Sequence, residues 1–243
     1  TTVGNSANLA EWEQAAVITV SSPMVDTDTA FIYQNRYEPH EMKIDGRYFA
    51  DYEDDDDLDI AGSGMDFLRN DGNDIFTQIP NTSFTSNSAT YLADFDNDGD
   101  LDFLNISDSS KIFKNNGNNE FNDIGALISQ LKYADAVNNS TPWCDFDNDG
   151  KLDFLLFGLN SRSEPKIFLY KNMGNDVFIE EKISFKAITR GTIEWIDYNR
   201  DGKPDVMVSG SDFNGSQSTN LYKNNGNGNF SSVSAGFPEL FNG

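Results

Sequence analysis

The chain has 243 residues, and its 40 acidic side chains against 17 basic ones give a formal net charge of −23 at pH 7. This charge excludes a nucleic-acid-binding surface, because phosphate recognition needs clustered Lys and Arg. No run of about 18 apolar residues is present, so we expect no membrane insertion. The single cysteine, Cys144, excludes an internal disulfide, while 37% hydrophobic residues suffice for a packed core.

Two short motifs recur along the chain. The first is an Asp-rich loop of nine residues, and its four copies begin 43, 51 and 52 residues apart, at Asp51–Asp59, Asp94–Asp102, Asp145–Asp153 and Asp197–Asp205. The second is an Asn-Gly turn, found within Phe67–Phe76, Ile112–Phe121, Leu169–Phe178 and Leu221–Phe230. Because Asn and Gly tolerate positive φ, each turn between apolar runs predicts a tight hairpin.

Each repeat predicts four short strands, with the Asp-rich loop between the first strand and an apolar second one. The second strands are expected at Leu101–Ile106, Leu152–Phe157 and Asp205–Val208. The apolar alternation has a period of two, which argues against helical repeats. Four-stranded units of about 50 residues in series predict an all-β fold, a β-propeller, because one such sheet cannot bury both faces alone.

In chain order, the sequence predicts five blades within one domain of residues 1–243. Their approximate limits are 8–44, 45–79, 88–123, 139–181 and 190–234. The alternative is a piece of a longer array of the same repeats.

The first unit is degraded. Trp12 aligns with the apolar residue two positions before each loop, and the strand Ala15–Val20 follows directly, as if the loop were deleted. Phe31–Asn35 matches the start of the turn motif, and Met42–Ile44 is the expected outer strand. Five units thus favour a closed ring.

The connecting segments differ most between repeats. Loops at Ser21–Thr29, Gly158–Lys166 and Gly210–Thr219 are polar, and we expect them at the rim opposite the Asp-rich loops. Ile124–Leu131 has apolar residues at helical spacing and predicts a short helical cap.

The Asp-rich loops are candidate calcium sites. Positions 1, 3 and 5 of a tight loop point to one centre, Gly at position 6 allows the bend, and position 9 closes the cage, as in a compressed EF-hand. Oxygen donors alone select a hard cation, and the flexible loop favours calcium over magnesium. Three sites are predicted, each with a backbone carbonyl at position 7: Asp94, Asp96, Asp98, Asp100 and Asp102; Asp145, Asp147, Asp149, Lys151 and Asp153; and Asp197, Asn199, Asp201, Lys203 and Asp205.

A fourth loop leaves two interpretations open. Glu53 stands at position 3 and Asp56 replaces the glycine. The candidate ligands there are Asp51, Glu53, Asp55, Asp57 and Asp59. This loop is either a fourth calcium site or a solvated acidic turn.

Two features resemble the FG-GAP/VCBS-type repeat, which is related to the integrin α-subunit propeller. They are the Asp-rich loop, as in Asp94–Asp102, and the turn motif Leu-Tyr-Lys-Asn-x-Gly-Asn-x-x-Phe that follows such a loop, as in Leu169–Phe178. The resemblance covers residues from about 45 to 232 well and 8–44 weakly. It implies calcium loops at Asp94–Asp102, Asp145–Asp153 and Asp197–Asp205. It also implies secretion or surface attachment, and adhesion, recognition or accessory roles, often with seven blades.

Our functional hypothesis is a secreted or cell-surface, calcium-binding recognition or adhesion module. Its partner would be a glycan or a protein, bound at the variable-loop rim, with no nucleic acid and no membrane insertion. One alternative is a polysaccharide-degrading enzyme whose channel carboxylates, Glu11 and Glu194, act as a pair. Another is a structural spacer in a larger surface protein.

Three tryptophans, Trp12, Trp143 and Trp195, share one repeat position with Phe49 and Leu92. This recurrence favours packing between blades over a carbohydrate platform. Cys144 is expected to be a packed, unreactive thiol. His40, the only histidine, is expected to be exposed without a catalytic role.

Overall fold

The computed structural model describes residues 42–44, 47–50, 52, 57–62, 67–73, 75–79, 89–107, 109–117, 120–131, 142–212, 214–234 and 237. Every regular element in these ranges is a β-strand. No helix in this part of the chain has the length and apolar character needed to cross a membrane.

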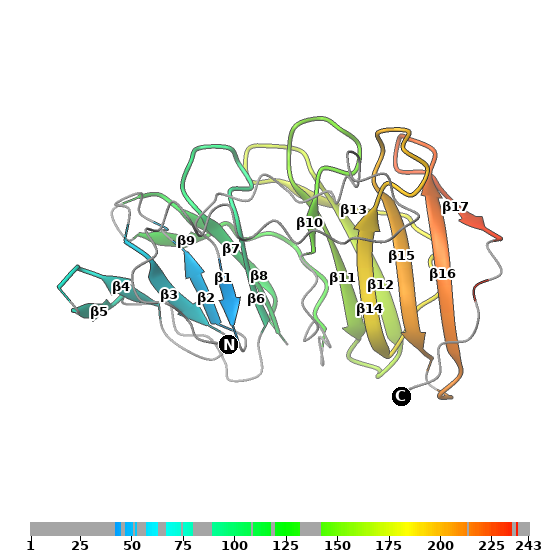
Figure 1. Cartoon of the computed structure of the whole chain (residues 1–243), viewed down its shortest axis with the longest axis horizontal. Coiled ribbons are helices and arrows are strands. Elements are labelled where there is room, and N and C mark those ends of the chain that lie inside the picture. The colour runs from blue at the N-terminus through cyan, green and yellow to red at the C-terminus, as the bar shows by residue number, and fades with distance from the viewer. Residues whose placement is uncertain are drawn as a thin grey trace, which may run out of the picture.

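The strands form four antiparallel sheets, which stand side by side in chain order (Figure 1). The first sheet contains β1 Met42–Ile44, β2 Arg47–Ala50, β3 Asp59–Gly62, β4 Leu68–Asn70 and β5 Phe76–Gln78. The second contains β6 Ala89–Ala93, β7 Asp102–Ile106, β8 Lys111–Asn115 and β9 Phe121–Asp123. The third contains β10 Trp143–Cys144, β11 Asp153–Leu159, β12 Pro165–Asn172 and β13 Phe178–Glu181. The fourth contains β14 Arg190–Ile196, β15 Asp205–Ser211, β16 Gln217–Asn224 and β17 Phe230–Val233.

Each sheet is a meander in which consecutive strands pair. The all-β class and the blade-like four-stranded pattern are therefore confirmed for the described residues. The expected second strands are also confirmed as β7, β11 and β15, and each begins at the ninth residue of its Asp-rich loop. Most of the first unit, with its strands at Ala15–Val20 and Phe31–Asn35, lies outside the described residues.

Two sequence-based expectations are wrong. Met42–Ile44 is not an outer strand of the first unit, because it pairs with β2 and makes the first sheet five-stranded. Residues 124–131 do not form a helical cap. Ile124, Ala126 and Ile128 instead pack on the core while Leu127 is 92% exposed, so burial selects the alternating pattern of an extended chain.

The core lies between neighbouring sheets. One cluster joins the second and third sheets and another joins the third and fourth. Trp143 is fully buried in the first of these and Trp195 is 8% exposed in the second. The prediction that these tryptophans pack between blades is confirmed for both, while Trp12 lies outside the described residues.

The Asn-Gly hairpins adopt the predicted tight turns. Val177 N donates to Gly174 O at 3.2 Å, and the two central residues, Asn175 and Asp176, have φ of 53° and 62°. Positive φ at both central positions defines a type I′ turn, which suits the twist of the flanking strands. The turn brings the end of β12 next to the Asp-rich loop that precedes β11.

Candidate metal centres

The three complete Asp-rich loops share one backbone conformation. Their fourth residues have left-handed φ of 62°, 59° and 60°, and their sixth residues are glycines with φ of 99°, 87° and 81°, at Asn97, Asn148, Arg200, Gly99, Gly150 and Gly202. Glycine and asparagine adopt this conformation at low cost. The Asp-Asn-Asp-Gly sequence therefore folds the first two of these loops locally, whereas the third adopts the same conformation with Arg200 at the fourth position.

The first aspartate of each loop closes the turn from inside. Asp145 accepts hydrogen bonds from Asp149 N at 2.9 Å and Gly150 N at 2.8 Å. The same two bonds form at Asp94 and at Asp197. These contacts hold the first carboxylate against the loop backbone.

The ninth aspartate joins the loop to the rest of its repeat. Asp153 is fully buried, and its two oxygens accept from Asn172 N at 2.8 Å and from Phe146 N at 3.1 Å. Asp102 and Asp59 bond in the same way to the hairpin and to the second loop residue. From the sequence we expected this aspartate only to close a metal cage. We missed that its carboxylate also connects the loop backbone to the hairpin of the same repeat.

Burial makes the ninth carboxylates difficult to ionise. It raises the pKa of Asp102 to about 9, with a further contribution from the charge of Asp96. Burial likewise raises the pKa of Asp153 to about 8, and the charge of Asp147 adds to it. A divalent cation beside such groups would favour their charged forms.

The carboxylates of two loops gather closely enough to share an ion. One oxygen from each of Asp94, Asp96 and Asp102 lies within 4.8 Å of the others. Asp145, Asp147 and Asp149 meet the same condition. Asp96 Oδ1 and Asp147 Oδ1 are buried without a hydrogen-bond partner. Because a buried, unsatisfied oxygen is costly, these two loops fit a bound cation.

Two predicted ligands lie outside these groups of three carboxylates. Asp98 Oδ2 lies 3.0 Å from Lys114 Nζ, and Asp153 does not belong to the group in its own loop. Lys151 N and Asp100 N each donate to the fifth loop residue at 3.1 Å.

The loop Asp197–Asp205 differs from the loops Asp94–Asp102 and Asp145–Asp153. Its carboxylates do not form a group of three among the described residues, since Asn199 stands where the other loops have aspartate. Asn199 Oδ1 instead accepts from Asp201 N at 2.8 Å. Lys203 N donates to the same Asp201 at 3.1 Å, and Asp205 is buried and accepts from Asn224 N at 2.7 Å.

The fourth candidate site, Asp51–Asp59, is described only in part. Asp51, Glu53 and Asp55 lie outside the described residues. Of its other members, Asp59 is buried and Asp57 is exposed. Both interpretations of this loop stay open.

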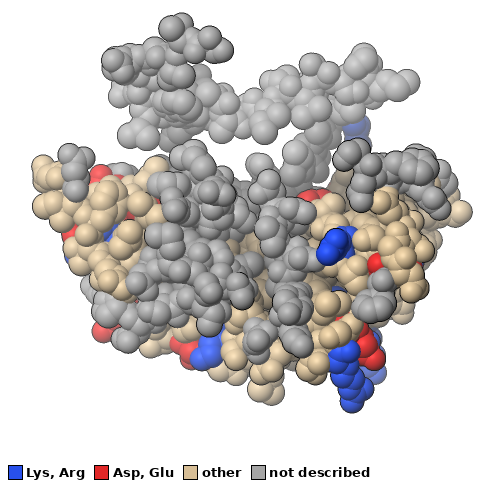
Figure 2. All heavy atoms as spheres, turned by 90° about the horizontal axis from the view of Figure 1, so that it is seen from below, with Lys and Arg blue, Asp and Glu red and all other residues tan. Residues whose placement is uncertain are grey.

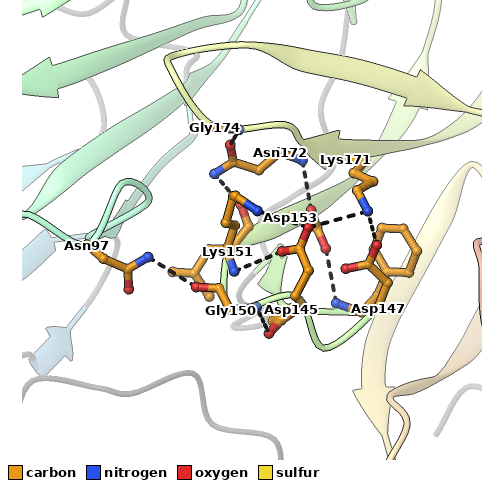
Figure 3. A network of polar contacts seen from close by, with 12 residues as sticks. Asn97, Asp145, Asp147, Gly150, Lys151, Asp153, Lys171, Asn172 and Gly174 are labelled. Atoms are coloured by element: carbon orange, nitrogen blue, oxygen red, sulfur yellow. Dashed lines mark hydrogen bonds and ion pairs between the residues drawn. The ribbon is translucent and has the colours of Figure 1, made fainter.

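Lysines from the third strands meet the acidic loops, and sequence analysis did not identify them. Lys171 contacts Asp147 and lies 3.4 Å from Asp149 Oδ2 (Figure 3). Lys114 makes the equivalent contacts with the preceding loop, and Lys223 lies 3.3 Å from Asp201. The contact with Asp147 raises the pKa of Lys171. The signal in the sequence was a basic residue preceding the Asn of each turn motif, which is Lys in three motifs and Arg69 in the first.

Basic side chains elsewhere on the described surface are dispersed. On the face shown in Figure 2, Lys and Arg lie in separate places, and several adjoin acidic side chains. Among the described residues visible on this face, the basic side chains form no continuous patch.

Neighbouring loops are tied to one another. Asn97 Nδ2 in one loop donates to Gly150 O in the next at 3.1 Å, as Figure 3 shows. Asn148 Nδ2 donates in turn to Gly202 O at 2.9 Å. The three loops thus form a connected row along one end of the sheets.

Comparison with known families matches the same region. The model of the FG-GAP-like repeat matches residues 94–156 and again residues 145–208, so each match begins at the first residue of an Asp-rich loop. Residues 94–208 therefore carry FG-GAP-like repeats. The resemblance deduced from the loop and turn motifs is thereby confirmed over these residues.

Other comparisons give less. A solved lectin of Agrocybe aegerita, described for its specific recognition of non-reducing terminal N-acetylglucosamine, is similar with a TM-score of 0.49 and 20% identity. The match covers 76% of this chain and 50% of the lectin chain, so the chain spans half the length of that relative. None of the curated proteins matches this chain.

Of the residues considered for catalysis, Glu194 lies in the described part of the chain. Glu194 is exposed on β14 and accepts from Thr192 Oγ1 at 2.8 Å. Its proposed partner Glu11 and the lone His40 lie outside the described residues. Cys144 is 1% exposed, which confirms the prediction that it is packed.

Proposed function

We propose that the chain is a secreted or cell-surface, calcium-stabilised β-propeller of five units that recognises a glycan or a protein. The observation that carries this proposal is the recurrence of one acidic loop in successive sheets, with a buried carboxylate oxygen that lacks a hydrogen-bond partner in each of three loops, at Asp96, Asp147 and Asp205. The acidic loop recurs with the repeat and is not a single specialised centre, which supports a structural role for the metal.

In the first two loops, the ion would be held by Asp94, Asp96 and Asp102, and by Asp145, Asp147 and Asp149. Calcium would supply charge neutralisation among carboxylates that otherwise repel each other. Extracellular calcium modules bind with Kd of about 10⁻⁴–10⁻³ M, a range that suits the calcium concentration outside cells. A calcium affinity of this chain in that range would support secretion or surface display.

The ligand surface is proposed at the opposite ends of the sheets. The β11–β12 loop is fixed by Asn160, whose Oδ1 accepts from Arg162 N at 3.0 Å and Glu164 N at 2.9 Å. The β15–β16 loop repeats this arrangement, because Asp212 Oδ1 accepts from Asn214 N and Ser216 N. Ordered turns with exposed polar side chains lose little entropy on binding, which favours recognition.

A glycan array and a protein-binding screen on the full chain in calcium test this proposal. Arg162→Ala and Asp212→Ala should weaken any binding found. Met173→Ala, at an exposed hairpin site near the acidic loops, is the matched control and should bind normally. No binding to either ligand class, or binding lost only in the Met173 variant, would contradict the proposed surface.

The enzyme hypothesis has its own experiment. If Glu194 serves in a carboxylate pair, Glu194→Gln abolishes release of reducing ends from a polysaccharide while the melting temperature stays the same. If the wild-type chain binds a glycan but releases no reducing ends, the result favours recognition over catalysis. Failure to bind any ligand, with assembly into larger particles, favours the spacer.

A further inference from the structure

Neighbouring acidic loops are connected through one side-chain amide and one peptide group. Asn97 Nδ2 of the loop Asp94–Asp102 donates to Gly150 O of the next loop at 3.1 Å (Figure 3). The nitrogen of that same peptide group belongs to Lys151, and it donates to Asp149 Oδ1 at 3.1 Å. Asp149 is one of the three carboxylates that gather in its loop. The peptide group is therefore held by the earlier loop on one side and by a candidate metal ligand on the other.

The next pair of loops repeats this connection. Asn148 Nδ2 donates to Gly202 O at 2.9 Å, and Lys203 N donates to Asp201 Oδ1 at 3.1 Å. Asn97 and Asn148 both stand at the fourth position of their loops, between the third and fifth residues, which are candidate ligands. A side chain that lies between two ligands of one loop thus contacts the backbone that positions a ligand of the following loop.

A second contact joins the same loops inside the core. Phe95 stands between the candidate ligands Asp94 and Asp96, and its carbonyl oxygen accepts from Asn172 Nδ2 at 2.9 Å. Asn172 N in turn donates at 2.8 Å to Asp153 Oδ1, the ninth residue of the following loop. Residues beside the candidate ligands of one loop are therefore connected to the next loop by two separate routes.

Repulsion between carboxylates makes the exposed route sensitive to a cation. Without an ion, the like charges within each loop favour a looser arrangement, and a cation among them favours the tight one. Asn97 is exposed, and its amide reaches Gly150 O when both loops hold their tight conformations. An ion in one loop therefore stabilises this contact, and the contact stabilises the conformation in which the neighbouring loop binds its own ion.

We propose that the acidic loops bind calcium cooperatively, and that Asn97 and Asn148 transmit the effect from each loop to its neighbour. This inference rests on the calcium role proposed above, but not on the glycan or protein ligand. Coupling between two sites is reciprocal, so both loops of a pair gain the same factor in affinity. A single exposed hydrogen bond sets this factor at roughly 2- to 10-fold. The charge of a bound ion acts in the opposite direction, and physiological ionic strength screens it between separate loops.

Hydrogen exchange of the full chain, followed by mass spectrometry across a calcium titration at physiological ionic strength, measures each loop separately. The half-saturation concentration of calcium is read from the protection of peptides that cover residues 94–102, 145–153 and 197–205. Asn97→Gly removes the amide and keeps the backbone φ of 62°, which glycine adopts at low cost. We expect this variant to raise the half-saturation concentration at residues 145–153 by roughly 2- to 10-fold, with a smaller effect at residues 197–205.

Two further variants establish that the effect follows the connections. Asn148→Gly should raise the half-saturation concentration at residues 197–205 by a similar factor. Asn227→Gly is the matched control, because Asn227 is also exposed with a positive φ, of 53°, but lies in the hairpin turn of the fourth sheet. It should leave the half-saturation concentrations of all three loops unchanged. An equal shift in the control would overturn the proposal.

A double-mutant cycle tests whether the effect passes between ions. Asp96→Asn weakens ion binding in its own loop and should raise the half-saturation concentration at residues 145–153. In the Asn97→Gly background it should cause no further rise. Fully additive shifts, or the same half-saturation concentration at residues 145–153 in Asn97→Gly and the wild type, would overturn the proposal. A chain in which calcium protects none of the loops refutes the calcium role and the coupling with it, whereas loops that fill independently refute only the coupling.

Discussion

Replacement of Lys171 by methionine tests whether the lysine of the turn motif competes with a metal ion. Lys171 contacts Asp147 and lies 3.4 Å from Asp149 Oδ2, and its side chain is 21% exposed. Two unit charges about 4 Å apart interact by about 1 kcal/mol in water and about 4 kcal/mol at an effective dielectric constant of 20. Partial exposure places this ammonium group toward the lower value, at about 1–2 kcal/mol.

We expect Lys171→Met to bind calcium more tightly, because the metal no longer displaces an ammonium group from the carboxylates. An energy of about 1–2 kcal/mol corresponds to roughly a 5- to 30-fold gain in affinity at that loop. The metal-free variant should melt at a lower temperature than the wild type, since the loop loses the ammonium group that Lys171 supplies from β12. Calcium-induced stabilisation should therefore be larger.

Isothermal titration calorimetry with calcium, with thermal melting in parallel, measures both effects. Lys166→Met is the control, because Lys166 lies on the same strand, β12, and pairs with Glu164 at 3.6 Å, away from the acidic loop. Asp147→Asn identifies the affected site in the titration. Unchanged or weaker affinity in Lys171→Met would refute the competition argument.

Three further predictions follow from the repeats. Chelation with EDTA should lower the melting temperature of the wild-type chain, because each site at a tenfold calcium excess contributes about 1.4 kcal/mol; an unchanged melting curve would contradict the calcium assignment. Asn172→Ala should reduce the free energy of unfolding in urea by about 2–4 kcal/mol, since Phe95 O, Leu152 O and Gly174 N lose a partner. As a control, replacement of the exposed Asn225 by alanine should change the free energy of unfolding by less than about 0.5 kcal/mol. Similar losses in the two variants would contradict the role of Asn172 in joining neighbouring repeats. Cys144 should react with a thiol reagent only on unfolding, and stoichiometric labelling of the native chain would show that the core opens readily.

Local motifs made much of the scaffold predictable. The loop residues Asn148 and Gly150 and the turn residue Asn175 all have positive φ, which glycine adopts because it lacks a Cβ atom and asparagine tolerates through its short polar side chain. The strands after the loops were also predictable, because an apolar run follows each of them directly. The helical cap at 124–131 was wrong because apolar spacing is ambiguous over eight residues, and contact with a neighbouring sheet decides which side chains are buried.

The sequence alone determined the repeat, its turns, the strand class and the candidate metal ligands, since these depend on residues close together in the chain. Tertiary structure decided which charges and polar groups meet across strands and repeats. Lys171 is 24 residues from Asp147, and Asn172 is 77 residues from Phe95. Such contacts depend on how sheets stack, and stacking also leaves Tyr198 exposed while it buries Phe95 and Phe146. Identical motifs thus acquire different surroundings from their place in the row of sheets.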